Sequence, residues 1–494
     1  MKLQFRESRT PRPGSQSVAL DRLANIEAKY VLLSAPVGSG KSLIGMAAAA
    51  GAESAFIVTP LNMLLEQYAR EFPEIPMVKG RSHYRCSWAK GMPCDLASET
   101  FLDQHSKNCE NYIPARNDFW GAPISVTNLH YACFARCPDE FGSNAHRRLL
   151  VVDECQGLEP MLLNLFHIEV LREDAESLGI DFGPTDVQRL FNDYVTQAGR
   201  GTEADDARLK DIVPDIRQRD RIKSTARKLA GLGQEDAKNP WHVERELGSV
   251  KCRPLFARKL ARRILDMADQ VLFMSGTPGN ADNFFRNLGI EPDENTAVVE
   301  VDSDFPRGYG VELIKNAPFV TGANLGKTLP ILADCCAQAM REHPAKGLIL
   351  CASYSLANQL AVPLRKEFRT RIVTHTSRTR DAAVLEHLQR TDPTVLIAVN
   401  MHEGLDLPGD LGRFLVIPKV LYTARDSWIT RREELDPGHY GRQTAARMVQ
   451  ACGRVVRGPN DWAHIYILDS NFQSVIRQYP EEFPAYFHRG FHVE

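Results

Sequence analysis

Short apolar runs alternate with amphipathic segments along the first part of the chain. Residues 30–35 form an apolar run rich in strand-forming side chains, and residues 43–50 follow as a run of small residues with helical character. A second apolar run at 55–59 precedes a helical pattern over 61–72. Because strand and helix patterns that alternate in this way are typical of βαβ units, the sequence predicts a parallel α/β sheet.

This pattern is interrupted twice. Between 78 and 118 no clean period is present and Cys, Lys, His and Asn are frequent, so we expect an insertion there. Apolar strand patterns return at 123–127 and 148–152. From about 158 to 269 the chain is charged and mainly helical in pattern, which predicts a second, helical insertion.

A second α/β block follows a linker near residues 289–295. Its predicted strands are 347–351, 371–374, 394–399, 414–417 and 464–468. The sequence therefore predicts two α/β domains, with both insertions in the first.

The composition is that of an ordinary globular protein. Of 494 residues, 43% are apolar and 25% are charged, and 60 Lys and Arg against 62 Asp and Glu give a formal net charge of -2. These values exclude a disordered chain, a collagen-like fibre and a wholly basic protein that holds nucleic acid by bulk charge, so a nucleic-acid site must be a local groove. The N-terminus lacks the apolar core of a secretory signal, and no run of about 18 apolar residues is present. We therefore expect a cytoplasmic protein without a membrane span.

A glycine-rich segment directly after the first predicted strand carries the first candidate chemistry. Its residues are Ala35, Pro36, Val37, Gly38, Ser39, Gly40, Lys41 and Ser42. They are close to the phosphate-binding P-loop pattern, with Ala35 in place of the usual first glycine. Backbone N–H groups and the positive end of the following helix would bind phosphate oxygens. Lys41 would reach the β- and γ-phosphates, and the Ser42 hydroxyl would bind Mg²⁺.

Two further groups fit the same chemistry. A buried-strand pattern ends in two carboxylates, of which Asp153 would hold Mg²⁺ and Glu154 would orient the attacking water. Farther along, Gln450, Arg454 and Arg457 are spaced four and three residues apart, so they fall on one face of a helix. Such a helix can present arginine side chains to a γ-phosphate held by another domain.

The ordered set of motifs resembles that of the XPD/DinG-like helicases of superfamily two, over nearly the whole chain. Residues 35–42 match motif I of the family, residues 450–457 match motif VI closely, and residues 275–277 are similar to motif III. Residues 58–67 and 350–354 resemble motifs Ia and IV. This resemblance implies two RecA-like P-loop domains with parallel sheets.

The resemblance also implies roles for residues that no spacing argument identifies. Gln16 looks like the family's adenine-reading glutamine, with one extra residue before it. At 153–156 the family has Asp-Glu-Ala-His, so the coupling role of that histidine would pass to Gln156. Residues 402–406 match motif V, which implies nucleotide contacts from Gly404 and Asp406.

Five of the eleven cysteines fall between positions 86 and 137. In a reducing compartment, clustered cysteines suggest metal ligands before disulfides. The resemblance implies a 4Fe–4S domain between motifs Ia and II, into which Cys86, Cys94 and Cys109 fit where the family uses four cysteines. Candidates for a fourth ligand are His105, Cys133 and Cys137. A zinc site and a metal-free domain remain open, since thiolates suit zinc as well. The spacing of Cys133 and Cys137 predicts that they lie on one helix face, packed in the core.

These arguments divide the chain into six segments. The first RecA-like domain comprises 1–77, 119–157 and 266–294, the cysteine-rich insertion is 78–118, the helical arch insertion is 158–265, and the second RecA-like domain is 295–494.

The resemblance implies an ATP-dependent DNA helicase, with ATP, Mg²⁺ and a 4Fe–4S cluster as cofactors. Such a protein would act as a monomer on single-stranded and forked DNA, with 5′→3′ polarity implied by the family alone. Candidate DNA contacts are Lys79, Arg81, Tyr84, Arg85 and the basic run 251–263. An ATP-driven translocase or remodeller on DNA or RNA that does not separate strands remains open. A nucleic-acid scaffold with a spent ATPase site is a third class, which the intact motif residues argue against. The pathway, DNA repair included, stays open, in a prokaryotic or phage-infected cell.

Overall fold

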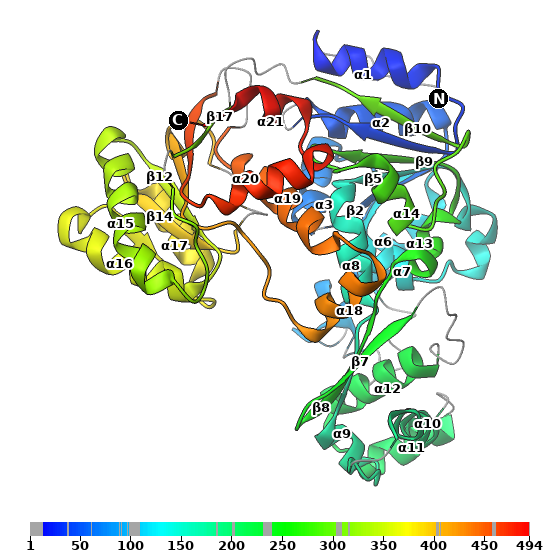
Figure 1. Cartoon of the computed structure of the whole chain (residues 1–494). Helices are drawn as coiled ribbons and strands as arrows, with labels where there is room; N and C mark the ends of the chain where they lie inside the picture. The colour runs from blue at the N-terminus through cyan, green and yellow to red at the C-terminus, as the bar shows by residue number, and fades with distance from the viewer. Residues whose placement is uncertain are drawn as a thin grey trace.

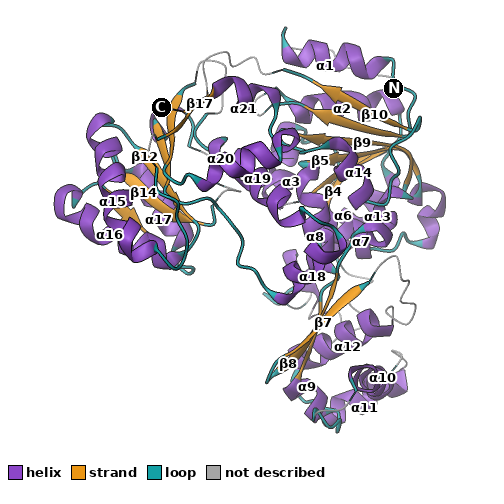
Figure 2. Ribbon diagram, viewed as in Figure 1, coloured by secondary structure: helices purple, strands orange, loops and turns teal. Residues whose placement is uncertain are grey.

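Two parallel sheets, each flanked by helices on both faces, form the body of the molecule (Figures 1 and 2). The computed structural model describes residues 13–493 apart from 37–38, 61, 88, 90, 96, 98–108, 184–185, 200–202, 231–239, 303–308, 315–316, 402–404, 406 and 457–460. Across this described part, no helix is long and apolar enough to cross a membrane. The predicted α/β class with two parallel sheets is confirmed.

The first sheet has seven strands, all paired in parallel. In sheet order they are β10 (Thr296–Glu300), β1 (Tyr30–Ser34), β9 (Ala268–Ser275), β5 (Arg147–Asp153), β2 (Ala55–Thr59), β4 (Ile124–Asn128) and β3 (Met77–Val78). Alternate residues of these strands enter two separate cores, one on each face. One core is closed by α1 (Ser15–Ala24), α2 (Lys41–Ala52) and α3 (Asn62–Glu71). The other is closed by α6 (Tyr112–Gly121), α7 (Leu129–Phe134), α8 (Leu158–Leu165), α13 (Arg258–Leu265) and α14 (Ala281–Asn287).

The second sheet is built in the same way. In sheet order its strands are β13 (Ile372–Thr374), β14 (Val395–Val399), β12 (Gly347–Cys351), β15 (Phe414–Ile417), β16 (Ala463–Ile467), β11 (Tyr309–Leu313) and β17 (Phe491–Val493). One face is covered by α15 (Leu325–Glu342) and α16 (Tyr354–Phe368). The other is covered by α17 (Arg380–Gln389), α19 (His439–Cys452), α20 (Asn471–Gln478) and α21 (Ala485–Gly490).

The boundary between the two domains differs from the sequence-based one. Strand β10 pairs with β1 from Tyr30↔Thr296 to Ser34↔Glu300, so residues 296–300 belong to the first sheet and not to the second domain. The short run Thr-Ala-Val-Val-Glu follows a polar linker, and we placed the boundary at that linker. An edge strand pairs on one side only, which leaves it without the long apolar run of a central strand.

The insertion after β5 contains a sheet that we did not predict. Helices α9 (Arg172–Ser177), α10 (Val187–Ala198), α11 (Glu203–Ile212) and α12 (Ile216–Ala230) pack with an antiparallel sheet of β6 (Ile168–Leu171), β8 (Ser249–Pro254) and β7 (Trp241–Arg245). One side of this sheet carries half-buried charged residues, among them Glu244, Lys251 and Arg253, which hide the alternation of its apolar residues in the sequence. The basic run 251–263 is therefore divided between β8 and α13.

Candidate nucleotide-binding site

The P-loop segment lies at the carboxyl end of β1, where the chain turns into α2. Gly40 has a φ of 79°, a left-handed conformation that glycine adopts without strain. The Lys41 ammonium donates a 3.4 Å hydrogen bond to the carbonyl oxygen of Ala35 and lies 3.7 Å from Oε1 of Glu154. The lysine therefore points back over the loop toward the second carboxylate of the β5 terminus.

The remaining P-loop residues are placed as follows. The Ser39 hydroxyl donates to the carbonyl oxygen of Pro36 at 2.7 Å, which closes the turn. Ser42 lies in the first turn of α2 and faces the same cavity as Lys41. Val37 and Gly38 lie outside the described residues.

The β5 terminus places one buried and one partly exposed carboxylate side by side. Asp153 is 3% exposed, and its Oδ2 accepts a 2.9 Å hydrogen bond from the buried hydroxyl of Tyr68 on α3. Burial, and then the neighbouring charge of Glu154, raise the pKa of the Asp153 carboxyl above its ordinary value, while Lys41 opposes the shift. A cation at this position would relieve that cost, which is the electrostatic setting expected of a Mg²⁺ ligand.

Gln156 connects the second carboxylate to another strand of the sheet. Its Nε2 donates to Oε2 of Glu154 at 2.9 Å, and its Oε1 accepts a 2.5 Å hydrogen bond from the Ser275 hydroxyl at the end of β9. The backbone N–H of Thr277 donates to the same hydroxyl at 2.9 Å. The side chain that replaces the family's histidine therefore links the segment around Glu154 to the segment that resembles motif III.

Residues from both ends of the chain complete the site. Gln16 on α1 is 2% exposed, and its Nε2 donates to the carbonyl oxygen of Gly40 at 3.3 Å. From the second domain, Gln450 and Arg454 approach on and just after α19, and the Arg454 guanidinium donates to the carbonyl oxygens of Gln450 (3.0 Å) and Leu405 (3.2 Å). Arg457, Gly404 and Asp406 lie outside the described residues.

A single cavity of about 1050 Å³ joins these groups between the two domains. The predicted site residues that line it are Gln16, Gly40, Lys41, Ser42, Asp153, Glu154, Gln156, Gln450 and Arg454. Its size exceeds the upper part of the usual range for small-molecule sites, about 300–1,000 Å³. The structure thus brings motifs that are more than 400 positions apart to one polar cleft.

Comparison with known proteins agrees with this geometry. Residues 336–490 match the Helicase C-terminal domain family. A solved XPD helicase structure superposes with a TM-score of 0.64 at 14% identity, covering 98% of this chain and 100% of that one, and the structure of Xpd4 from S. tokodaii does so with a TM-score of 0.55 at 15% identity, covering 94% and 96%. The ATP-dependent DNA helicase YoaA of Haemophilus influenzae is 22% identical over 215 residues, which are 42% of this chain and 32% of the relative. Residues 336–490 therefore belong to the Helicase C-terminal domain family, and the chain as a whole is similar in fold to the XPD helicases. It matches only about a third of the length of YoaA, and the structural likeness concerns the fold.

The predicted metal ligands Cys86, Cys94 and Cys109 do not form a metal site among the described residues. The backbone N–H groups of Cys86 and Cys94 donate to the carbonyl oxygens of Met92 and Tyr84, each at 2.9 Å, which places these two cysteines near each other. Burial, and then the neighbouring thiol of Cys109, raise the pKa of Cys94 to about 11. Among the described residues, no three His, Cys, Asp or Glu side chains are arranged to hold a metal ion. His105 lies outside these residues.

The prediction that Cys133 and Cys137 share one helix face is wrong. Helix α7 ends at Phe134, so Cys133 is helical and buried in the core while Cys137 lies beyond the helix. The Cys137 thiol donates to the carbonyl oxygen of Phe141 at 3.2 Å. Pro138 follows Cys137, and the residue before a proline is disfavoured in the helical conformation.

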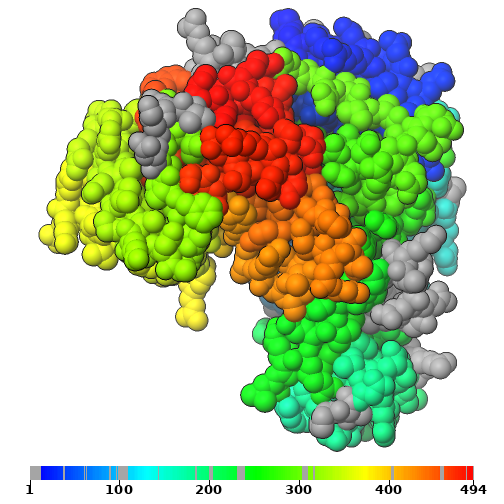
Figure 3. Space-filling model, in the orientation of Figure 1, coloured from blue at the N-terminus to red at the C-terminus, as the bar shows by residue number. Residues whose placement is uncertain are grey.

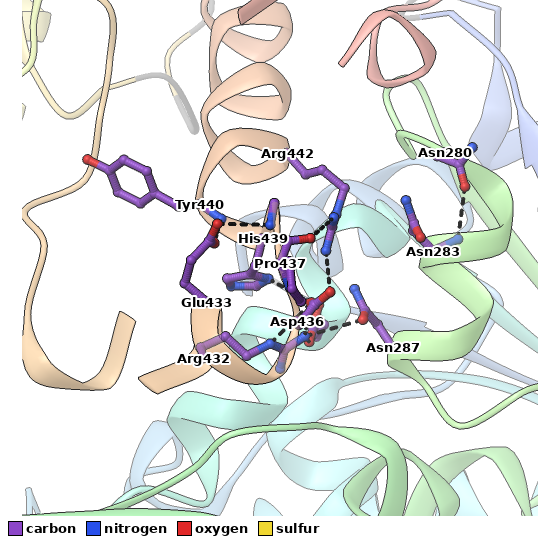
Figure 4. A network of polar contacts seen from close by, with 12 residues as sticks. Asn280, Asn283, Asn287, Arg432, Glu433, Asp436, Pro437, His439, Tyr440 and Arg442 are labelled. Carbon is purple, nitrogen blue, oxygen red and sulfur yellow. Dashed lines mark hydrogen bonds and ion pairs between the residues drawn. The ribbon is translucent and has the colours of Figure 1, made fainter. Parts of the chain in front are cut away.

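Several cavity residues escaped the motif analysis. Gln443 and Arg447 precede Gln450 by seven and three positions on α19, a helical spacing that could have identified them. Opposite them, Asn283 and Asn287 project from α14 toward the second domain, as Figure 4 shows. No sequence signal marks these asparagines, because their role depends on the packing of two distant segments.

Proposed function

We propose that this protein is an ATP-dependent DNA helicase that translocates 5′→3′ along single-stranded DNA and unwinds duplex DNA. The observation that supports it best is the shared cavity, in which Lys41, Asp153 and Glu154 of the first domain face Gln450 and Arg454 of the second. Hydrolysis at a site divided between two domains changes how the domains are held together, and such a change can drive movement along a strand. The 5′→3′ direction and the DNA substrate are carried over from the family.

Each residue has a distinct task in this proposal. The Asp153 carboxylate and the Ser42 hydroxyl fit Mg²⁺, which prefers oxygen ligands and would neutralise charge on the phosphates. Lys41 stabilises the negative charge of the phosphates, and Glu154, fixed by Gln156, orients the attacking water. Arg454 reaches in from the second domain and stabilises the charge that develops on the transferred phosphoryl group.

The decisive experiment compares unwinding of 5′-tailed and 3′-tailed duplexes with ATP. We expect unwinding of the 5′-tailed substrate by the wild type, and Lys41→Ala should lower hydrolysis on the order of 100-fold because phosphate charge is left unpaired. The matched control is Lys29→Ala, which removes an exposed lysine that lies over the Tyr30 ring, outside the cavity.

Each alternative has its own outcome in this experiment. Unwinding of neither substrate would contradict the helicase. DNA-stimulated hydrolysis without unwinding would favour the translocase, and unwinding from a 3′ tail would contradict the direction alone.

The insertions belong to the same proposal. We assign 78–118 to the family's iron–sulfur domain and 158–265 to its arch, with Cys86, Cys94 and Cys109 as thiolate ligands. Iron and sulfide analysis after anaerobic purification decides whether the metal centre is present, with Cys94→Ser as the variant. The control is Cys335→Ser, which changes a partly exposed thiol of the second domain.

A monomeric state and a cytoplasmic location complete the proposal.

A further inference from the structure

Helix α18 (Ser427–Leu435) follows β15 of the second domain in the chain but packs against the first. Trp428 and Ile429 are each 5% exposed and lie in the core that α8, α13 and α14 close. The Trp428 indole donates to the carbonyl oxygen of Pro254 at 3.0 Å, and Arg253 lies over its ring at 4.5 Å. Figure 3 shows the orange segment that contains α18 seated directly on the green first-domain chain. This helix is therefore a part of the second domain that the first domain holds.

Arg432 is the centre of this attachment. Its side chain is completely buried, and its guanidinium donates to Glu159 of α8 at 2.8 Å and to Asn287 of α14 at 3.2 Å. It also donates to the carbonyl oxygen of Leu255 and lies 4.1 Å from the ring centroid of Phe256. All four of these partners precede residue 300, so the Arg432 guanidinium joins α18 to several elements of the first domain.

The other end of α18 is fixed to the start of α19. Asp436 accepts from Arg432 at 3.2 Å and from Arg442 at 2.5 Å, and its Oδ2 lies 3.4 Å from Nδ1 of His439 (Figure 4). Burial alone would raise the pKa of Asp436, but the hydrogen bond from His439 and the charges of both arginines hold it well below its ordinary value.

A second carboxylate closes the same corner. The Glu433 side chain accepts from the backbone N–H groups of Gly438 and Tyr440, each at 2.8 Å, and so satisfies donors that the first turn of α19 leaves free. Before α18, residues 418–426 run without helix or strand, and Val420 and Leu421 among them are buried in the core of the second domain. Helix α18 is thus joined to the second domain at both ends, and its hydrogen-bonded connection toward the cavity is the one to α19.

Helix α19 carries the residues that face the nucleotide cavity from the second domain. Gln450 lies on it and Arg454 directly follows it, while Ala445, Met448 and Val449 pack in the core of the second domain. We propose that α18 is an anchor by which the first domain holds α19 across the cavity, with Arg432 and Asp436 as positioning residues for Arg454. This inference rests on the proposed ATPase. It adds how Arg454 is held in position opposite Lys41 and Asp153.

A double-mutant cycle on ATP hydrolysis tests the anchor. Arg432→Met should lower kcat about 10- to 100-fold, since a small misplacement of a catalytic group is that costly, while the Kd for nucleotide changes less than about threefold. Arg454→Lys lowers kcat by itself and leaves a measurable rate. In the double variant the Arg432→Met change should cost little further, because it acts through Arg454. Arg431→Met is the matched control, since Arg431 is the adjacent residue of α18, is 51% exposed and pairs only with Glu434 among the described contacts.

The outcomes separate this inference from the proposed function. The anchor would be overturned if Arg432→Met lowered kcat by the same factor in the Arg454→Lys background as in the wild type, or if Arg432→Met alone left kcat unchanged. In either case hydrolysis by the wild type still upholds the ATPase. A wild type without ATPase activity overturns the proposed function and the anchor together. If Arg432→Met does not fold, Asp436→Asn enters the same cycle, because it keeps the shape of the side chain and removes the charge that holds Arg442 and Arg432.

Discussion

The hydroxyl of Ser275 donates a 2.5 Å hydrogen bond to the side-chain oxygen of Gln156, whose nitrogen in turn donates to Glu154. These contacts join the ends of β5 and β9, so a displacement of the 275–277 segment changes the position of the carboxylate assigned to the attacking water. Gln156 makes this connection with both ends of its side-chain amide.

Replacement of Gln156 by Glu should lower kcat about 10-fold, because the new carboxylate faces Glu154 and cannot donate to it. Ser275→Ala keeps Glu154 and Gln156 in contact and should reduce mainly the stimulation of ATPase activity by single-stranded DNA. Steady-state hydrolysis with and without DNA measures both effects. Equal loss of basal and stimulated rates in Ser275→Ala would contradict the coupling role.

The Tyr68 hydroxyl supplies the buried Asp153 carboxylate with a 2.9 Å hydrogen bond. Tyr68→Phe removes this donor, and a hydrogen bond to a charged group contributes about 1.5–3 kcal/mol. We expect the Mg²⁺ concentration for half-maximal ATPase activity to rise about 10-fold, because the carboxylate is no longer fixed in orientation. Tyr30→Phe is the control, since the Tyr30 hydroxyl receives only a long hydrogen bond from Arg262 outside the cavity. An unchanged Mg²⁺ dependence in Tyr68→Phe would show that the hydrogen bond has no such role.

The sequence was sufficient to predict the α/β class and the motif residues that the structure describes in the cavity. Asp153 ends the apolar strand β5 and Lys41 follows the apolar strand β1 after the glycine-rich loop, and parallel strands bring such ends to one edge of a sheet. Gln450 and Arg454 both line the cavity, but the predicted common helix face is wrong for them, because α19 ends at Cys452 and Arg454 lies beyond it. These patterns depend on residues that are close together in the chain, so they can be recognised from a single sequence.

The unpredicted features are those that arise only from tertiary contacts. Strand β10 is recognisable only by its pairing with β1, and β7 and β8 carry half-buried charged residues that interrupt the apolar pattern of a strand. Arg432 looks like one more charged residue in the sequence Thr-Arg-Arg-Glu-Glu, yet it is fully buried while Arg431 beside it is exposed. Which of two neighbouring arginines enters an interface depends on partners about 145 to 275 positions away.

Gln16 contacts the backbone of the P-loop. Because the Gln16 amide donates to the carbonyl oxygen of Gly40, Gln16→Ala should loosen the loop and also remove the adenine contact that we propose for this residue. We expect KM for ATP to rise about 10-fold, the equivalent of one lost hydrogen bond, and the preference for ATP over GTP to decrease. Ser17→Ala is the control on the same helix, since that hydroxyl donates to Gly14 away from the cavity. A KM that rises equally in both variants would indicate a general effect on α1.

Glu482 is a buried carboxylate at the domain interface, and its pH dependence can be predicted. Its Oε2 accepts from the backbone N–H of Asn280 at 3.1 Å, and burial raises its pKa although Asn280, Asn283 and Arg442 oppose the shift. A carboxyl with a folded-state pKa above its unfolded value stabilises the fold most below the unfolded pKa, about 4.3 for Glu, and that contribution is lost as the pH rises through the folded pKa.

Glu482→Gln should therefore raise the apparent Tm at pH 8, by on the order of 1–3 °C, because the neutral amide avoids the cost of a buried charge and still accepts from Asn280. The advantage should shrink as the pH falls toward 5, where protonation already relieves the wild type. Thermal unfolding between pH 5 and 8 measures this, with Glu481→Gln at the exposed neighbouring position as the control. A variant less stable than the wild type at pH 8 would mean that the attraction to Arg442 outweighs burial, and that the ionised carboxylate is a favourable contact between the domains.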